Sequence, residues 1–512
     1  MVFQTVNNLT NNTEKSYFKE KIDIYTKIVA AACSIHGIEA EKANEEECID
    51  KLKEIGVIDK REDLDELKKV LSKDKYQNYI DAVATEIRHS TEISPYVINL
   101  NNQRRKELQK AEKSRDALTM VDLFCGAGGL SLGFKQNGFK TLLATDFDPL
   151  CIETYRYNHP EIPDDKIICE DIRKLSETIE EKVSDSVDII IGGPPCQGFS
   201  SANKHHRVID DPRNELYKYF VKVVKKLSPK VVVMENVKGM LKVADQVVED
   251  FENVQIGDET QKLNYLVAYR LLLSSDFGVA QNRERLIYIA IRRDIAEKLE
   301  ITPETIFERI EHNNVNKQQH NLSEALEGVR ELIAPHKMGV GEIDTEENGR
   351  KIDVNTFNGQ ENEYLRLINE GRIMPLVFNH KARYCSELNQ EIYCRMEPGD
   401  DATDPKIADI MPYAHRNDKF KDKYYRLYGD RPCRTITAHL RSDCHSHIHP
   451  YEDRTITPRE AARVQSFPDD YLFMGPYLKT YIQIGNAVPV VMSRGIAEVI
   501  KDCLSGEGYE NS

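Results

Sequence analysis

Short apolar runs alternate with longer polar stretches of helical character from residue 118 onward, and this alternation constrains the fold more than any other feature. The runs cover residues 118–124, 141–145, 166–169, 187–191, 231–234 and 286–291. Buried strands that alternate with helices are typical of βαβ units, which build a parallel sheet. The sequence therefore predicts an α/β domain, and such domains bind ligands at the carboxyl ends of their strands.

The sequence on either side of this alternation has a different character. The first 116 residues are charged, and residues 62–71 and 103–115 place apolar side chains at helical spacing. We expect a separate helical N-terminal domain, residues 1–116, of unknown role. Between about residues 293 and 428 no period is clear, which indicates a second domain or a large insertion. Helical order returns at residues 487–504.

Cysteine usage and hydropathy indicate in which cellular compartment the protein resides. The eleven cysteines are scattered without a CxxC pair, which favours a reducing, intracellular environment over a disulfide framework. The first 21 residues lack the apolar segment of a signal peptide, and no run approaches the length of a membrane span. We therefore expect a cytoplasmic protein without membrane contact.

The net charge of −15 disfavours a nucleic-acid partner at first sight, but the local charge matters more than the total. Residues 415–449 hold eight Lys/Arg against four Asp/Glu, together with five of the fourteen histidines and several tyrosines. Basic residues interleaved with aromatic and hydroxyl side chains suit phosphate contact and base reading. The alternative interpretation is an ordinary solvated surface.

A single cysteine stands in an unusual loop after the run at residues 187–191. Two glycines and two prolines, residues 192–195, turn the chain sharply and stiffen it before Cys196. A cysteine on a rigid loop at the carboxyl end of a strand lies where chemistry occurs in an open α/β sheet. An inert structural cysteine would more often sit mid-strand among aliphatic residues, so we favour a reactive Cys196.

A glycine-rich turn, residues 124–131, follows the first apolar run and opens a helix, where backbone N–H groups can approach a ligand. NAD fits poorly, because the dinucleotide pattern requires glycine at Ser131. Asp146 ends the next run, where a carboxylate can accept both hydroxyls of a ribose. Phe147 can lie against an adenine face, and Asp171 can read an adenine amino group. Together these residues predict a nucleoside-bearing cofactor.

A carboxylate and two arginines are further candidates for this edge of the sheet. Glu235 ends the run at residues 231–234 and is either solvated or aimed into the site. It would lie near Cys196 if their strands are neighbours. Arg283 and Arg285 precede the last run, and they would reach the same edge if that strand runs antiparallel. Surface charge at a strand entrance is the alternative for both arginines.

The motifs closely resemble, in order, those of DNA cytosine-5 methyltransferases. They are Asp122–Gly129, Gly193–Ser200, Glu235–Val237, Gln281–Arg285, Arg459–Pro468 and Gly485–Pro489. The resemblance covers about residues 118 to 504, and six motifs in one order make a chance agreement negligible. One departure is Asp146, where the family usually has glutamate. The aspartate side chain is one methylene shorter but can still accept hydrogen bonds from the ribose hydroxyls, with a different geometry.

The resemblance implies a Rossmann-like methyltransferase domain with a smaller, mixed target-recognition domain. The catalytic domain would be discontinuous, residues 117–300 plus 477–512, and residues 301–476 would recognise the target. The helical residues 1–116 lie outside the resemblance. Residues 459–468 would support the packing of the recognition domain rather than contact bases.

The resemblance also implies the reaction: methyl transfer to carbon 5 of a cytosine in a specific duplex DNA sequence. Cys196 would add to carbon 6, which makes carbon 5 nucleophilic. Glu235 would hold and protonate the N3 edge of the base, and Arg285 would stabilise charge at O2, with Arg283 as a helper. The target base must first be flipped out of the duplex.

S-adenosyl-L-methionine is the implied methyl donor. Residues expected to bind it are Phe124, Gly126, Ala127, Gly128, Gly129, Leu130, Asp146, Phe147, Asp171, Ile172, Pro194, Asn486 and Ala487. Residues expected to contact DNA are Gln197, Ser200, Arg431, Arg434, Thr435, Thr437, His439 and Arg441.

No metal is needed for this reaction. Cys433 and the histidines in residues 444–449 could in principle form a zinc site, but neither CxxC nor His-x3-His spacing supports one. Structural or phosphate contacts are the favoured interpretation of these histidines.

Two alternatives to a DNA methyltransferase stay open at this point. A tRNA cytosine-5 methyltransferase uses the same thiol chemistry, and a catalytically silent relative could bind DNA as a regulator. The retained Cys196, Glu235 and Arg285 oppose the second. The expected partners are double-stranded DNA and a cognate restriction endonuclease. We expect a monomer on DNA, associated with the nucleoid of a prokaryote.

Overall fold

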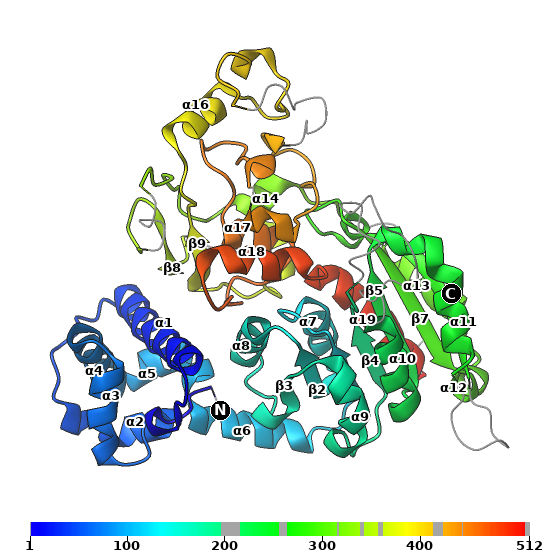
Figure 1. The fold of residues 1–512 in the computed structure, drawn as a ribbon, viewed down its shortest axis with the longest axis horizontal. Helices are drawn as coiled ribbons and strands as arrows, with labels where there is room; N and C mark the ends of the chain where they lie inside the picture. The colour runs from blue at the N-terminus through cyan, green and yellow to red at the C-terminus, as the bar shows by residue number, and fades with distance from the viewer. Residues whose placement is uncertain are drawn as a thin grey trace.

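A seven-stranded sheet forms the centre of the computed structural model, which describes residues 2–195, 216–254, 264–314, 317–337, 343–356, 362–412, 423–442 and 444–506. The strand order is β3-β2-β1-β4-β5-β7-β6 (Figure 1). The strands are β1 (Thr119–Leu123), β2 (Lys140–Asp146), β3 (Ile167–Cys169), β4 (Ile189–Gly192), β5 (Val231–Asn236), β6 (Tyr265–Leu273) and β7 (Glu284–Arg292). The first five are parallel, and β7 runs antiparallel to both β5 and β6.

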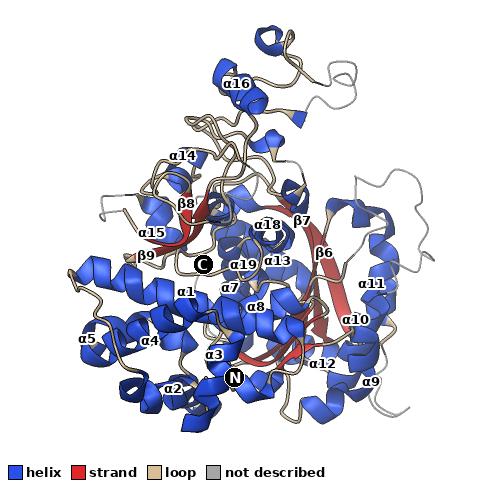
Figure 2. Cartoon of the chain, turned by 60° about the vertical axis from the view of Figure 1, so that its left-hand side comes forward, coloured by secondary structure: helices blue, strands red, loops and turns tan. Residues whose placement is uncertain are grey.

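Successive residues of the central strands enter two different apolar cores, because side chains alternate across a sheet. Met120 belongs to the core that contains residues of α7 (Gly129–Gln136) and α19 (Val490–Ser505). Its neighbour Val121 belongs to the opposite core, with residues of α9 (Ile172–Lys182) and α10 (Leu216–Leu227). Helices therefore cover both faces of the sheet (Figure 2).

Each of the six apolar runs overlaps a strand, so the predicted α/β sheet is confirmed. The antiparallel direction of β7 is also the condition on which the placement of Arg283 and Arg285 depended. Strand β6 was not predicted. It lies at the edge of the sheet, where apolar residues such as Leu266 and Val267 are partly exposed. Its two faces therefore differ little in burial.

The N-terminal residues form helices, as predicted, and they pack beside the sheet domain (Figure 1). They are α1 (Asn12–His36), α2 (Ile49–Ile55), α3 (Leu64–Val70), α4 (Lys73–Arg88), α5 (Ser90–Ile93) and α6 (Asn102–Ser114). The two predicted helices correspond to α3 and α6. Asn11 caps α1 by accepting a hydrogen bond from Glu14 N–H, and Gly37 ends it at φ +65°.

The remaining helices are distributed over the sheet domain and the region above it in Figure 1. They are α8 (Pro149–Asn158), α11 (Ala244–Glu252), α12 (Arg293–Leu299), α13 (Pro303–Asn314), α14 (Leu322–Leu326), α15 (Glu363–Ile368), α16 (Glu387–Arg395), α17 (Pro458–Val464) and α18 (Tyr477–Asn486). A two-stranded antiparallel sheet, β8 (Gly349–Val354) and β9 (Leu376–Lys381), lies in this upper region.

Helix α17 is buried along its whole length, including its two arginines. Arg459 donates to the carbonyls of Phe378 and Pro468, and Arg463 pairs with Asp469 at 2.7 Å. Buried guanidinium groups need such partners. These contacts agree with the expectation that residues 459–468 support packing.

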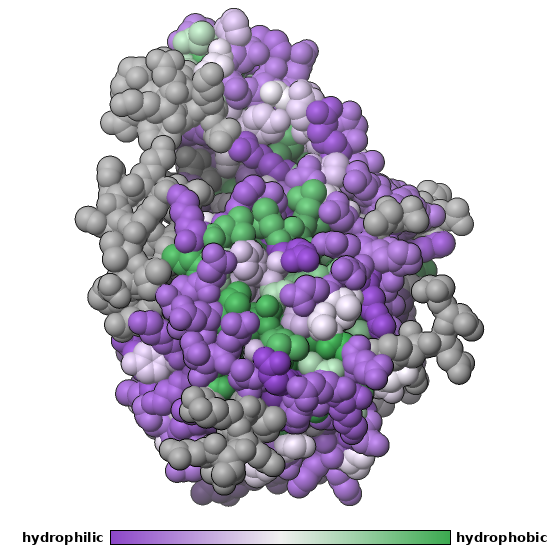
Figure 3. Space-filling view, turned by 90° about the vertical axis from the view of Figure 1, so that its right-hand side faces the viewer, coloured by the Kyte–Doolittle hydropathy of each residue, from purple (hydrophilic) through white to green (hydrophobic). Residues whose placement is uncertain are grey.

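The surface on the side of α11–α13 is mostly hydrophilic, with apolar residues gathered near its middle (Figure 3). Among the helices that the structure describes, none has the length and apolar character to cross a membrane.

Candidate active site

The glycine-rich turn after β1 folds back onto the end of β2. Gly126 N–H donates to Asp146 Oδ2 at 2.9 Å, and Cys125 N–H donates to the carbonyl of Thr145 at 2.9 Å. Gly126 and Gly128 have φ values of +53° and +90°, which favour glycine. The turn then enters α7, so it forms a cradle of backbone groups at a helix N-terminus.

Asp146 is the half-buried carboxylate of this cradle. Besides Gly126, the backbone N–H of Asp148 donates to it at 2.8 Å. Burial raises the pKa of Asp146, although both N–H donors act in the opposite direction. Phe147 beside it is 73% exposed, so its ring is free to contact a ligand.

Asp171 and Ile172 begin α9 at the neighbouring strand end. Asp171 is the N-cap of α9 and accepts a hydrogen bond from Arg173 N–H at 2.9 Å. Its carboxylate also pairs with the Arg173 guanidinium, which lowers the pKa of Asp171. The structure therefore gives Asp171 a capping role in addition to the predicted contact with adenine.

Two returning segments close the cradle. Gly129 lies so close to the Val488 carbonyl and the Ala487 side chain that a Cβ there would stand 2.4 Å and 3.0 Å from them. The OH of Tyr471 donates a close hydrogen bond to the carbonyl of Ala127. Ala487 is thus brought to the glycine turn, and Asn486 beside it is exposed.

The end of β4 lies beside the end of β5, because the two strands are parallel neighbours. A Cβ on Gly193 would stand 2.8 Å from Glu235 Oε2. Asn236 Nδ2 donates to the carbonyl of Pro194 at 3.0 Å. The neighbourhood assumed for Glu235 and the cysteine loop is therefore observed up to Pro195. Cys196, Gln197 and Ser200 lie outside the described residues.

Asn236 received no role from the sequence, although it follows Glu235 in a recognised motif. Its hydrogen bond holds the first part of the cysteine loop, so we add it to the candidate residues. The only available signal was its place in that motif.

Glu235 and Arg285 form an ion pair between β5 and β7. Arg285 Nε lies 2.7 Å from Glu235 Oε1, and the side chains are 13% and 12% exposed. Burial lowers the pKa of Arg285, which Glu235 counteracts. From the sequence, each residue could belong to the site or to the solvated surface. The structure places them together in a nearly buried site.

Arg283 is fully buried and binds two backbone carbonyls. It donates to Ile436 O at 2.5 Å and to Gly485 O at 2.9 Å. Burial lowers the pKa of Arg283 well below that of a free arginine. Arg283 thus joins three segments that surround the site, and surface charge is excluded as its description.

Gln281 and Gln465 form a second network that sequence reasoning missed. Gln281 Nε2 donates to Gln465 Oε1 at 2.7 Å, and Ile436 N–H donates to Gln281 Oε1 at 2.7 Å. Gln465 in turn donates to the carbonyls of Ile484 and Ala487. Both glutamines occur in recognised motifs, which was the only signal in the sequence.

The predicted DNA-contact segment lies beside this network. Asn282 N–H donates to Cys433 O at 2.8 Å, and the Thr435 hydroxyl donates to Asn282 O at 2.8 Å. The Arg431 guanidinium stacks 3.8 Å from the centre of the Tyr428 ring. The exposed candidates are Arg431, Thr437, His439 and Arg441, whereas Arg434 and Thr435 are half-buried.

The histidines of residues 444–449 have structural partners. His445 hydrogen bonds to Tyr393 and stacks on Tyr424 at 4.6 Å. His449 groups with Glu452 and Glu460, whose side-chain oxygens could join it around a metal ion. Arg454 pairs with both of these carboxylates at 2.7 Å. A buried arginine therefore already compensates one of these two negative charges.

Comparisons with known proteins identify the family. The model of the C-5 cytosine-specific DNA methylase family matches residues 118–502. The type II methyltransferase M.DdeI of Desulfomicrobium norvegicum is 33% identical over 400 residues, which cover 75% of this chain and 88% of that protein. The type II methyltransferase M1.HphI of Haemophilus parahaemolyticus is 33% identical over 399 residues, which cover 75% of this chain and 87% of that protein.

Among solved structures, one from E. coli is similar with a TM-score of 0.57 and 25% identity, covering 76% of this chain and 100% of its own. Its description assigns it as a DNA modification methyltransferase encoded within a prophage. The family match and these relatives favour DNA over tRNA as the substrate. The chain belongs to the C-5 cytosine-specific DNA methylase family and is a DNA (cytosine-5) methyltransferase.

Proposed function

We propose that this enzyme methylates carbon 5 of a cytosine flipped out of duplex DNA, through a covalent adduct with Cys196. The observation that carries the proposal is the ion pair of Glu235 and Arg285. It lies beside Gly193 and Pro194, on the sheet edge that also holds the glycine turn. A base edge could meet a carboxylate and a guanidinium there at once.

Each residue has a separate task in this proposal. The Cys196 thiolate bonds to carbon 6 of cytosine, and the displaced electron pair makes carbon 5 the nucleophile. Glu235 must first take up a proton, which it then donates toward N3 as negative charge builds on the ring. Arg285 stabilises that charge from the O2 side. Loss of the proton at carbon 5 after methylation expels the thiolate and regenerates Cys196.

Arg283 is the proposed helper in this arrangement. Its two hydrogen bonds to backbone carbonyls support an indirect role, in which it fixes the segments around Arg285.

We assign S-adenosyl-L-methionine to the cradle formed by residues 124–130, with Asp146, Phe147, Asp171, Ile172, Pro194, Asn486 and Ala487 around it. When bound, it supplies an electrophilic methyl group. The residues present fit a nucleoside, since a glycine turn at a helix N-terminus, a half-buried carboxylate and an exposed aromatic ring lie together. Binding measured by calorimetry tests this assignment without requiring activity.

The domain division is also a proposal. Residues 117–300 plus 477–512 would form the catalytic domain and residues 301–476 the recognition domain. Support comes from α19, which packs on α7 in the sheet domain although residues 301–476 separate it in sequence from the strands of that domain. The proposed DNA contacts are Gln197, Ser200, Arg431, Arg434, Thr435, Thr437, His439 and Arg441.

We further propose a restriction–modification setting, with a cognate endonuclease, in the cytoplasm and at the nucleoid. The names of the relatives as type II methyltransferases support this setting. We propose that the enzyme acts as a monomer on DNA.

Cys196→Ser tests the reaction, with Cys394→Ser as the matched control because Cys394 is an exposed cysteine on α16. Transfer of labelled methyl groups to duplex DNA should fall at least about 1,000-fold in the first variant and stay normal in the second. A duplex with 5-fluorocytosine should trap the parent covalently, since fluorine cannot leave as a proton does. Normal activity of Cys196→Ser would overturn the proposal.

A further inference from the structure

Helix α1 of the N-terminal region packs against β8 and contacts α8 of the sheet domain through an ion pair. Figure 1 shows α1 below the β8–β9 pair. The apolar side of α1, including Phe18 and Ile22, belongs to a core that continues into both neighbours. The residues that these neighbours contribute are Leu150 and Tyr157 of α8, Ile352 of β8, Leu376 and Phe378 of β9, and Leu472 and Met474 of the segment before α18. The N-terminal helices therefore share one core with α8, with the β8–β9 pair and with the segment before α18.

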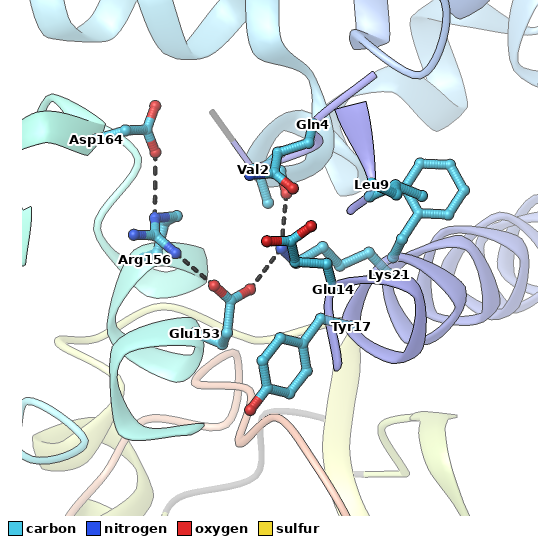
Figure 4. A pocket seen from close by; sticks show the side chains of 10 residues that line it. Val2, Gln4, Leu9, Glu14, Tyr17, Lys21, Glu153, Arg156 and Asp164 are labelled. Atoms are coloured by element: carbon cyan, nitrogen blue, oxygen red, sulfur yellow. Dashed lines mark hydrogen bonds and ion pairs between the residues drawn. The ribbon is translucent and has the colours of Figure 1, made fainter. Parts of the chain in front are cut away.

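On the side of the sheet domain, Lys21 of α1 pairs with Glu153 of α8. The ion pair measures 2.5 Å, and both side chains are 10% exposed. Glu153 also contacts Arg156, which pairs with Asp164 (Figure 4). These residues line a cavity of about 310 Å³ between α1 and α8. This row of charges fixes the position of α1 against the catalytic sheet.

Glu20 lies next to Lys21 and contacts two other segments. Its Oε1 accepts a hydrogen bond from Gly475 N–H at 2.6 Å and pairs closely with the Lys351 ammonium group of β8. Gly475 has a φ of +97°, and a Cβ there would stand 2.3 Å from Leu150 of α8. One carboxylate thus joins α1 to β8 and to the segment by which the chain returns to the sheet domain.

Lys27, two turns further along α1, holds the start of the β8–β9 pair. It pairs with Asp344 at 2.7 Å, and Asp344 also pairs with Lys381 of β9 at 2.9 Å. The backbone N–H of Lys351 donates to the same carboxylate at 3.2 Å. Asp344 therefore links α1 to both strands.

Strand β9 continues directly to the proposed DNA contacts. Arg383, two residues after β9, donates to the carbonyl of Leu440 at 2.7 Å. Leu440 lies between His439 and Arg441, which are both exposed. A displacement of β9 would therefore be transmitted to the segment that carries these two side chains.

We propose that α1 is a brace and that Glu20 and Lys27 are positioning residues for DNA binding. They hold β8–β9, and through it His439 and Arg441, in a fixed place relative to the catalytic edge. The proposal rests on the assignment of His439 and Arg441 as DNA contacts. A surface held in its binding geometry loses less conformational entropy when DNA binds, so the brace lowers the Kd for DNA without taking part in chemistry.

The test compares Lys27→Met, Glu20→Gln and the double variant with two controls. Lys19→Ala changes an exposed lysine of the same helix, and Lys27→Arg keeps the charge that pairs with Asp344. The DNA is a duplex that contains the motif methylated by the parent, found by bisulfite sequencing of host DNA. The measured quantities are kcat, KM for DNA, KM for S-adenosyl-L-methionine, the Kd for DNA at several salt concentrations and the thermal unfolding midpoint.

The double variant should raise KM for DNA about tenfold and leave kcat and KM for the methyl donor within about twofold of the parent. The slope of log Kd for DNA against log salt should stay constant, because no phosphate contact is removed. Lys27→Arg and Lys19→Ala should behave as the parent. Lys27→Met alone keeps the test valid if the double variant unfolds, since the Lys27 side chain is 32% exposed.

Two results would overturn the brace. One is an unchanged KM for DNA in Lys27→Met and Glu20→Gln. The other is a joint loss of kcat and of affinity for the methyl donor, which would mean that α1 merely supports the catalytic fold. Failure of the proposed reaction would be seen separately, as a parent enzyme that does not methylate duplex cytosine.

Discussion

Arg285 Nε lies 2.7 Å from Glu235 Oε1 across the antiparallel strands β5 and β7. Both side chains are nearly buried, so each charge depends on the other for compensation. The pair lies beside the backbone of Gly193, at the entrance to the cysteine loop. The charges of Glu235 and Arg285 are therefore coupled. Substituting one residue at a time tests the role of each.

Glu235→Gln should lower kcat by about 100-fold or more, because the amide cannot deliver a proton to the ring. DNA affinity should change little, since the shape of the side chain is kept. Single-turnover methyl transfer checks this. Glu284→Gln, at the neighbouring exposed position that pairs with Lys238, is the control and should retain full activity. An active Glu235→Gln would remove the acid from the mechanism.

Arg283→Met should mainly destabilise the fold. The substitution leaves the carbonyls of Ile436 and Gly485 without their buried donor, at a cost of about 3 kcal/mol. Denaturant unfolding measures this loss. If Arg283→Met instead lowers only kcat at unchanged stability, Arg283 acts in the chemistry itself.

Phe147→Ala should weaken binding of S-adenosyl-L-methionine about tenfold by removing an aromatic surface for adenine. The side chain is 73% exposed, so stability should stay constant. Calorimetric titration of the free enzyme checks both points. Ile373→Ala, another exposed apolar position, should bind the methyl donor normally. Equal affinity in the two variants would contradict the assignment of the cradle.

Asp122 should make stability fall as pH rises. Burial raises the pKa of Asp122 to about 8, partly offset by the Ser131 hydroxyl. Between the pKa of an unfolded chain, about 4, and this value, the folded state keeps a proton that the unfolded state releases. The contribution of Asp122 to the free energy of unfolding is therefore complete below about pH 4. It decreases by up to about 1.4 kcal/mol per pH unit and is lost by about pH 8. Asp122→Asn should flatten this part of the curve of unfolding free energy against pH. An unchanged slope would show that Asp122 is ionised in the folded protein.

The sheet and its edge were predictable because their signals are local. Apolar runs predict strands, and a glycine turn after a strand predicts a ligand cradle. Neither prediction depends on how distant segments pack. The placement of Glu235 and Arg285 at this edge depended on two assumptions, that β4 and β5 are neighbours and that β7 runs antiparallel, and both hold. The contact between the two side chains was not predicted.

Contacts between distant segments were not predictable from local pattern. Glu20 and Gly475 are 455 residues apart in sequence, and nothing around Glu20 distinguishes it from the many charged residues of α1. The sequence around Arg283 does not distinguish it from a surface arginine, because the carbonyls that it binds, those of Ile436 and Gly485, come from distant segments. Strand β6 was missed because an edge strand lacks a clear inner and outer face.

The shared core beneath α1 has a consequence for how this enzyme can evolve. Exchanging the proposed recognition region, residues 301–476, as a cassette would replace the proposed DNA contacts at residues 431–441 of this enzyme. Here such a cassette must also supply partners for Glu20 and Lys27, as Lys351 and Asp344 do now. The N-terminal helices and the recognition region are therefore expected to be inherited together, and an exchange that includes only one of them should yield a chain that binds its DNA weakly.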